Sequence, residues 1–217
     1  MPRVTVYNPK PGEIESLDAQ IWDIDKNIPK LLPAAFYKDI PLQSLRAWCV
    51  RRAIYQIPTI ELVDWLKNKI AGKRAIEVGS GNNGLCHYLG IQGTDNRCQQ
   101  LPEVITLYEM AGQVPTNPAD SIKTLDAVDA VKRYKPDIIV ASWITQKKLV
   151  QGNGNQYGPE EEKIVDSGRV YIHIGNVDIH GDKRILSRPH QKIVAPGLVS
   201  RSAYPDLNCV YVWNDGT

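Results

Sequence analysis

The stretch Arg74-Ala-Ile-Glu-Val-Gly-Ser-Gly-Asn-Asn-Gly84 carries the strongest fold signal in this chain. Its first residues form a short apolar run, and three glycines follow with the spacing G-x-G-x-x-G. Such runs are typical of buried parallel strands, and glycines permit positive φ angles and close approach of a ligand to the backbone. The stretch predicts a strand, a ligand-binding turn and a helix N-terminus with unpaired N–H donors. A tight strand-to-helix turn without a ligand is the alternative.

The sequence on either side of this stretch alternates between helical and strand-like patterns. Helical spacing is seen at 42–57, 59–70, 85–89, 125–134 and 159–166, and strand-like runs at 74–78, 91–95, 137–141, 169–174, 190–199 and 207–213. Alternating strands and helices indicate an α/β fold with a parallel sheet and right-handed crossovers. The last two strand-like runs follow each other without a helix, which suggests an antiparallel edge.

The length of 217 residues fits one domain with an extension. Residues 1–20 mix Pro, Gly and charge and suggest a loosely packed arm, and prolines then interrupt short helices up to about residue 57. We therefore expect an N-terminal arm and helical cap at 1–70 and a sheet domain at 71–217.

Composition excludes several classes of protein. The chain has 26 Lys+Arg and 24 Asp+Glu, a net charge of +2, and the balance holds on both sides of residue 70. This argues against strong nonspecific nucleic-acid binding. There is no apolar stretch for a signal peptide or membrane span, and the four cysteines lack zinc-finger or disulfide-framework spacing. We expect a cytoplasmic protein without a membrane partner.

Two carboxylates flank the glycine-rich turn. Glu77 lies two residues before Gly79, where it can accept hydrogen bonds from a ligand or orient the turn. Asp95 ends the next strand-like run, and a carboxylate at that place can bind both hydroxyls of a ribose. Dinucleotide-binding proteins use an equivalent acid, so Asp95 does not by itself distinguish between nucleotide cofactors.

The order of four segments resembles the class I S-adenosylmethionine-dependent methyltransferases. Glu77 to Gly84 is similar to their first motif and Gly93-Thr-Asp95 to their second. The segment 123–127 resembles the third motif, and 136–143, which ends in Ser142-Trp143, resembles the fourth. The resemblance covers roughly residues 55–175.

The resemblance implies a Rossmann-like sheet of seven mostly parallel strands in the order 3-2-1-4-5-7-6, with a helical N-terminal extension. It also implies S-adenosylmethionine as cofactor. Glu77 and Gly79 would lie near its methionine part, Gly81 near the sugar, Asp95 at the ribose, and Asp126 with the Ala127 amide at the adenine. The full predicted cofactor set is Glu77, Gly79, Gly81, Asn83, Gly84, Asp95, Asp126, Ala127 and Ser142. For Asp126 a simple helix N-cap is the alternative.

The acceptor side of the resemblance is weaker. Residues 142–145 are Ser-Trp-Ile-Thr rather than the Asn/Asp-Pro-Pro-Tyr/Phe of amino-directed nucleic-acid methyltransferases, and there is no Pro-Cys pair. Trp143, Thr145 and His180 are the catalytic candidates. Trp143 can stack on an acceptor or face the sulfonium, or be a core residue; His180 can be a base, or an exposed loop histidine.

Other features leave alternatives open. Tyr55 precedes the pre-strand helix and is either a pocket or a core residue. The basic residues Lys147, Lys148, Lys183, Arg184, Arg188 and Lys192 either contact phosphates or form solvated surfaces. Loop 151–158 is either a lid over the acceptor or a plain connection. The four histidines show no metal-binding spacing, so we expect no metal.

Three functions remain possible at this level. The favoured one is a methyltransferase that acts by in-line displacement on an unidentified acceptor, either a small molecule, a protein or a local nucleic-acid site. The second is an inactive binding or assembly protein of the same fold, since the acceptor motif is missing. The third, an NAD(P)-dependent oxidoreductase, rests on the same glycine spacing and is disfavoured by Glu77 and Asp126.

Overall fold

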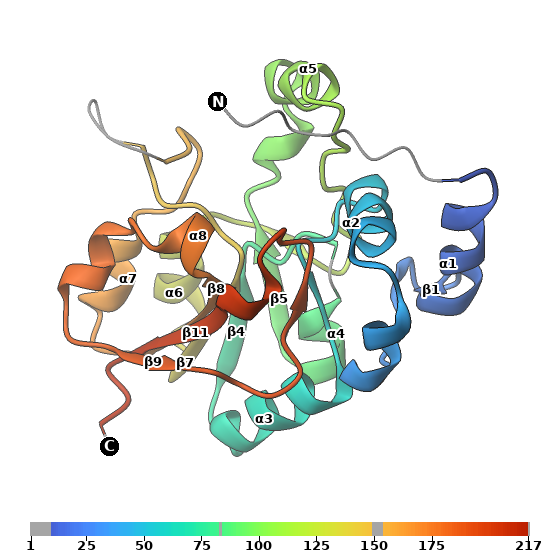
Figure 1. Cartoon of the computed structure of the whole chain (residues 1–217). Coiled ribbons are helices and arrows are strands. Elements are labelled where there is room, and N and C mark those ends of the chain that lie inside the picture. The colour runs from blue at the N-terminus through green and yellow to red at the C-terminus, as the bar shows by residue number, and fades with distance from the viewer. Residues whose placement is uncertain (1–9, 83, 149–153, 217) are drawn as a thin grey trace.

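The computed structural model describes residues 10–82, 84–148 and 154–216, and its centre is a mixed seven-stranded sheet with helices on both faces (Figure 1). The α/β class is therefore confirmed. The spatial order of the strands is β6-β5-β4-β7-β8-β11-β9. Their bounds are β4 Ala75–Val78, β5 Gln92–Asp95, β6 Lys123–Thr124, β7 Ile138–Ser142, β8 Val170–Asn176, β9 Gln191–Ile193 and β11 Asn208–Trp213.

The strand that carries the glycine loop lies inside the sheet. β4 pairs in parallel with β5 and β7, so Val78 lies between Thr94 and Ala141. β11 pairs antiparallel with both β8 and β9, which makes the sheet mixed. All five residues of β7 are buried, as expected for a strand covered on both faces.

Two sets of helices cover the faces of the sheet. Helices α3 (Ile60–Ile70) and α4 (Leu85–Leu89) pack with the side chains of Val140, Ile172 and Val210. Helices α6 (Ala127–Tyr134) and α7 (Glu161–Val165) pack against the other face. The Thr59 hydroxyl caps α3 by accepting from the N–H of Leu62.

The expected strand at 190–199 is wrong in extent. Only Gln191–Ile193 joins the large sheet, and β10 (Val199–Ser200) pairs instead with β3 (Gln56–Ile57). The cause is local, because Pro196 interrupts strand pairing and Gly197 has φ 73°. The Gly197 carbonyl accepts a 2.7 Å hydrogen bond from the Thr59 hydroxyl, which directs the chain toward α3.

The N-terminal extension is more ordered than the sequence predicts. Residues expected in an arm contain α1 (Glu13–Ile21), which packs against α2 (Leu42–Arg51) around the fully buried Trp48. Between these helices lie β1 (Trp22–Asp23), β2 (Ile28–Pro29) and the 3-10 helix η1 (Ala34–Asp39). The boundary at residue 70 remains a prediction; α3 itself packs on the large sheet.

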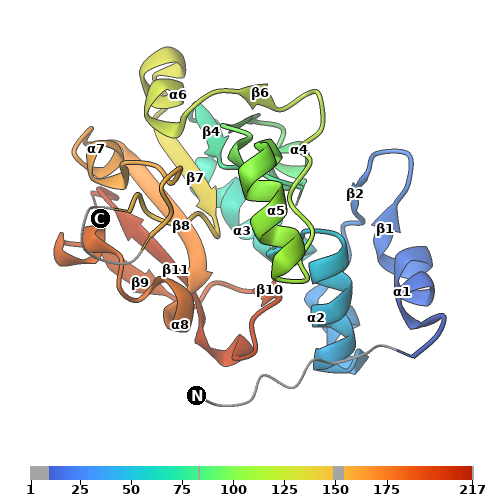
Figure 2. The same ribbon diagram turned by 90° about the horizontal axis from the view of Figure 1, so that it is seen from above.

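Helix α5 (Pro102–Met110) has no counterpart in the sequence prediction. It follows the 3-10 helix η2 (Cys98–Gln100) and projects above the sheet (Figures 1 and 2). Its Leu107 and Met110 side chains are exposed. The remaining short helices are α8 (Val177–His180), η3 (Arg184–Ser187) and η4 (Pro205–Leu207). In the described parts of the chain, every helix is too short or too polar to cross a bilayer.

Candidate functional site

A cavity of about 960 Å³ opens at the carboxyl ends of β4, β5, β7 and β8. In open α/β sheets, ligands bind in the crevice at these strand ends. Helix α2, helix α5 and the segment after β10 also contribute to its wall. The predicted site residues that line it are Gly79, Gly81, Asp95, Asp126, Ala127, Ser142, Trp143, Thr145 and His180.

The glycine loop needs its glycines for two reasons. Gly79 and Gly81 have φ of 64° and 51°, a region that favours glycine. A Cβ on Gly79 would lie 2.4 Å from Cγ2 of Ile144, so the loop and the residues after β7 approach closely there. The backbone at Gly79 and Gly81 borders the cavity without a side chain of its own.

Two predicted cofactor residues, Glu77 and Gly84, do not line this cavity. Glu77 is completely buried, and its Oε2 accepts a 3.0 Å hydrogen bond from the N–H of Cys86, so it orients the start of α4. Gly84 lines a second cavity, of about 610 Å³, on the other side of the loop. Asn83 lies outside the described residues.

The Asp95 carboxylate holds the backbone on both sides of itself. Oδ2 accepts a 3.0 Å hydrogen bond from the N–H of Gly81, and Oδ1 accepts a 2.7 Å hydrogen bond from the N–H of Arg97. An ionised carboxylate has about four acceptor sites. The two oxygens therefore retain acceptor capacity toward the cavity that Asp95 lines.

Asp126 and Ala127 lie at the first turn of α6. Asp126 is the N-cap, and its Oδ1 accepts a 2.9 Å hydrogen bond from the N–H of Val128. The helix-cap alternative is therefore confirmed. Both residues also line the cavity, so capping and a role in binding are compatible.

Residues after β7 place an aromatic ring in the cavity. Trp143 has φ 58°, an unusual angle for a bulky residue. Its Nε1–H donates a 3.2 Å hydrogen bond to Oε1 of the buried Gln56. Trp143 is only partly buried, so it is not a core tryptophan. The neighbouring Ser142 hydroxyl is covered by protein atoms and makes no hydrogen bond within the described structure.

His180 is buried, which contradicts the exposed-loop alternative; only 2% of it is accessible. Nδ1 accepts a 3.0 Å hydrogen bond from the N–H of Asn176. Nδ1 also lies 3.2 Å from the carbonyl oxygen of Asn176, and Nε2 is covered by protein atoms and makes no hydrogen bond among the described residues. Burial, together with the nearby Lys183 ammonium, lowers the pKa of His180 to about 3. The ring packs edge-on against Trp143, with centroids 5.3 Å apart.

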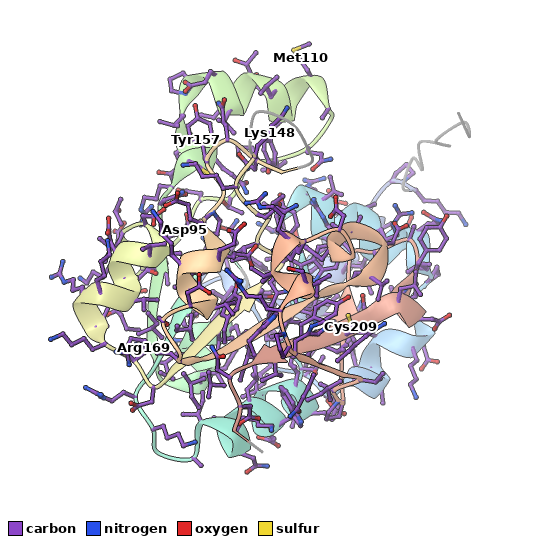
Figure 3. The ribbon with its side chains drawn as sticks, turned by 90° about the vertical axis from the view of Figure 1, so that its left-hand side faces the viewer. Asp95, Met110, Lys148, Tyr157, Arg169 and Cys209 are labelled. Atoms are coloured by element: carbon purple, nitrogen blue, oxygen red, sulfur yellow. The ribbon has the colours of Figure 1, made fainter. Side chains whose placement is uncertain are left out.

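A loop and a helix face each other beside the cavity. Thr145, Asn155 and Tyr157 line it. The Tyr157 hydroxyl donates a 2.7 Å hydrogen bond to Oε1 of Glu103 on α5, and the Asn96 side chain donates to the Tyr157 carbonyl. Figure 3 shows Tyr157 between Asp95 and α5. The lid predicted at 151–158 falls partly outside the described residues and remains a prediction.

Sequence reasoning missed the basic part of the wall. Arg46 and Arg51 of α2 and Arg201 after β10 line the cavity. The helical spacing at 42–57 gave no sign that these arginines face a site. Tyr55, which the sequence left open, also lines the cavity, and its hydroxyl lies 3.0 Å from the hydroxyl of Tyr108.

The predicted basic surface contains one buried residue. Lys183 forms a 2.5 Å ion pair with Glu161, and both side chains are inaccessible to solvent. The Tyr171 hydroxyl donates a 2.7 Å hydrogen bond to the other oxygen of Glu161. Burial lowers the pKa of Lys183. The Glu161 carboxylate thus connects α7 to β8 and to Lys183, and Lys183 is not part of a phosphate-binding surface.

The described part of the chain contains no group of three or more His, Cys, Asp or Glu side chains that could hold a metal ion. The chain matches no protein-family model. A search of curated proteins likewise gives no significant match.

Proposed function

We propose that this chain is an S-adenosylmethionine-dependent methyltransferase. The observation that carries the proposal is the convergence of the four motif-like segments on one cavity. Gly79 and Gly81, Asp95, Asp126 with Ala127, and Ser142 come from separate places in the sequence and line the same space.

The arrangement of the sheet supports the same proposal. When the seven strands of this sheet are numbered in chain order from β4 to β11, their spatial order is 3-2-1-4-5-7-6. Only β11 runs against the others, since β9 and β8 both pair antiparallel with it. This is the order and orientation that the resemblance implies for methyltransferases of this class.

The residues around the cavity fit the cofactor. The backbone at Gly79 and Gly81 lines the cavity, where a ligand can approach it closely. Asp95 retains acceptor sites for ribose hydroxyls, and the Asp126 carboxylate uses one oxygen as a helix cap. The volume of about 960 Å³ lies at the upper end of the range for ligand pockets, so it has room for a second molecule.

S-adenosylmethionine, when bound, supplies a methyl group on a positively charged sulfonium. The chain contributes alignment and exclusion of water, which are the main requirements of such a displacement. The Trp143 and Tyr55 rings, with centroids 6.3 Å apart, offer π-faces to a cation or a planar acceptor. The His180 ring packs edge-on against Trp143 and helps to hold it in place; the low pKa of His180 makes it a poor proton acceptor at neutral pH.

A thermal-shift experiment tests the proposal. A ligand at 100 times its Kd stabilises the folded state by about 2.7 kcal/mol, which corresponds to a rise in Tm of roughly 5–10 °C at this chain length. We expect such a rise with S-adenosylhomocysteine and none with NAD at equal concentration. No shift with a folded protein at millimolar S-adenosylhomocysteine would refute the proposal, and a shift with NAD alone would favour the oxidoreductase.

Turnover distinguishes an enzyme from an inactive protein of the same fold. Radiolabelled S-adenosylmethionine incubated with small-molecule extracts, proteins and nucleic acids should transfer label to one of these fractions. Cofactor binding without transfer to any fraction would favour the inactive binding protein.

A further inference from the structure

The cavity has a positively charged wall that the proposed cofactor does not explain. Arg46 and Arg51 on α2 and Arg201 after β10 line it. The acidic residues Asp95 and Asp126 come from the strand-end side, where the proposed cofactor would bind. A second ligand bound against the wall formed by α2 and residues 201–203 would therefore be favoured if it carried a negative charge.

Arg46 and Arg201 lie next to each other. Nε of Arg46 donates a 3.2 Å hydrogen bond to the backbone carbonyl of Arg201, and its Nη1 donates to Oε1 of Gln43. The Arg201 guanidinium stacks 3.6 Å from the centroid of the Tyr55 ring, and its Nη2 donates to Oε1 of Gln113. In the described part of the chain, the arginines that form ion pairs with carboxylates are Arg51, Arg52, Arg74, Arg184 and Arg188. Neither Arg46 nor Arg201 pairs with a carboxylate there.

One nitrogen of Arg201 is left without an acceptor. Nη1 is covered by protein atoms and makes no hydrogen bond in the described structure. The rest of the guanidinium lines the cavity, and a half-buried charge without a carboxylate partner is unfavourable, so an anion in the cavity would stabilise it. Carboxylates and phosphates are the groups that fit the planar guanidinium and its parallel N–H donors.

Aromatic rings connect Arg201 to the proposed site of transfer. Tyr55 lies under the guanidinium, the Trp143 ring is 6.3 Å from Tyr55, and the His180 ring is 5.3 Å from Trp143. A ligand along these rings would meet the Arg201 cation at one end and the Trp143 ring at the other.

We propose that Arg201, with Arg46 beside it, forms an anion subsite, and that the methyl acceptor is a small molecule with a carboxylate or phosphate group. The identification of this ligand as the acceptor rests on the proposed function. The anion subsite itself does not depend on it, because it follows from the uncompensated arginines.

Matched pairs of small probes test the subsite. Phenyl phosphate is compared with phenol, and benzoate with benzamide, by calorimetric titration into the full chain with and without saturating S-adenosylhomocysteine. We expect at least one anion to bind about tenfold or more tightly than its neutral counterpart, on the scale of a hydrogen bond to a charged group. The preferred pair identifies the phosphate or the carboxylate as the recognised group.

Two substitutions and one control locate the effect. Arg201→Gln should abolish the preference for the anion, and Arg46→Gln should reduce it. Arg133→Gln, at an exposed position on α6, should leave it unchanged. If Arg201→Gln does not fold, Arg46→Gln still decides the question, because an unchanged preference there contradicts the paired-arginine subsite.

The remaining outcomes separate the two proposals. Equal affinity for anions and neutral probes, with S-adenosylhomocysteine bound, overturns the anion subsite and leaves the methyltransferase proposal intact. Loss of S-adenosylhomocysteine binding in Arg201→Gln also overturns it, because the arginine would then bind the cofactor's own carboxylate. If S-adenosylhomocysteine does not bind the folded wild type, the function proposal fails; an Arg201-dependent preference for anions then still supports the subsite.

Discussion

Oδ2 of Asp95 accepts a hydrogen bond from the N–H of Gly81, so the carboxylate at the end of β5 holds the glycine loop that follows β4. Its other oxygen binds the N–H of Arg97, at the start of the segment that leads to α5. One side chain thus joins two walls of the cavity. Any ligand that binds Asp95 is therefore coupled to the conformation of the glycine loop.

Asp95→Ala should weaken the binding of S-adenosylhomocysteine by about 1–3 kcal/mol, the scale of lost hydrogen bonds to a charged group. The same substitution leaves two backbone N–H groups without their acceptor, so the free energy of unfolding should also fall by about 1–3 kcal/mol. Calorimetry and urea denaturation measure the two effects separately.

The matched control for Asp95 is Asp129→Ala on α6, where the carboxylate is exposed and pairs only weakly with Lys132. It should change neither quantity. Unchanged affinity for S-adenosylhomocysteine in Asp95→Ala would show that the ribose, if bound at all, is held elsewhere.

Gly79→Ala should destabilise the protein more than Gly72→Ala. Both glycines have positive φ, which costs a residue with a Cβ roughly 1–2 kcal/mol. At Gly72 nothing lies within 4 Å of the new Cβ, whereas at Gly79 it would lie 2.4 Å from Ile144. The difference between the two unfolding free energies therefore measures the close contact alone. Equal losses would show that Ile144 moves aside at no cost.

The sequence predicted the central elements well because their signals are local. The apolar run of β4, the glycine loop and the helical spacing of α6 each lie within a dozen residues. The order of these elements was enough to bring Asp95, Asp126 and Ser142 to the same strand ends. The parts that were missed depend on contacts distant in sequence.

The pairing of β10 with β3 and the meeting of Arg46 with Arg201 are examples of such contacts. His180 shows the same limit, because its ring packs against Trp143, which follows β7 and is distant in sequence. Glu77 was predicted either to contact the ligand or to orient the loop. Its hydrogen bond from the N–H of Cys86 favours the second role, and this contact was not evident from the sequence.

The buried ion pair gives a third prediction. Lys183→Met removes the cation and leaves Glu161 charged and buried, held only on its Tyr171 side, so it should cost about 3–5 kcal/mol. Lys163→Met breaks the exposed pair with Glu160 and should lower the free energy of unfolding far less, because solvent screens an exposed pair. Urea denaturation compares them. A loss of under about 1 kcal/mol in Lys183→Met would show that Glu161 becomes protonated or hydrated without penalty.

The His180 ring makes stability depend on pH in a defined direction. Its folded pKa is lowered to about 3, first by burial and then by Lys183, with Asp182 acting in the opposite sense. As the pH decreases below about 6.5, this histidine binds a proton in the unfolded chain but not in the folded chain. The free energy of unfolding therefore falls as the pH decreases from about 6.5 toward 3. Between pH 7.5 and pH 5 this one ring accounts for about 2 kcal/mol. Over that pH range the free energy of unfolding of His180→Gln should fall by about 2 kcal/mol less than that of the wild type, as measured by parallel urea titrations. The buried His173, whose pKa is also lowered by burial, contributes equally in both proteins. Identical slopes for the two proteins would mean that His180 gains its proton in the folded state.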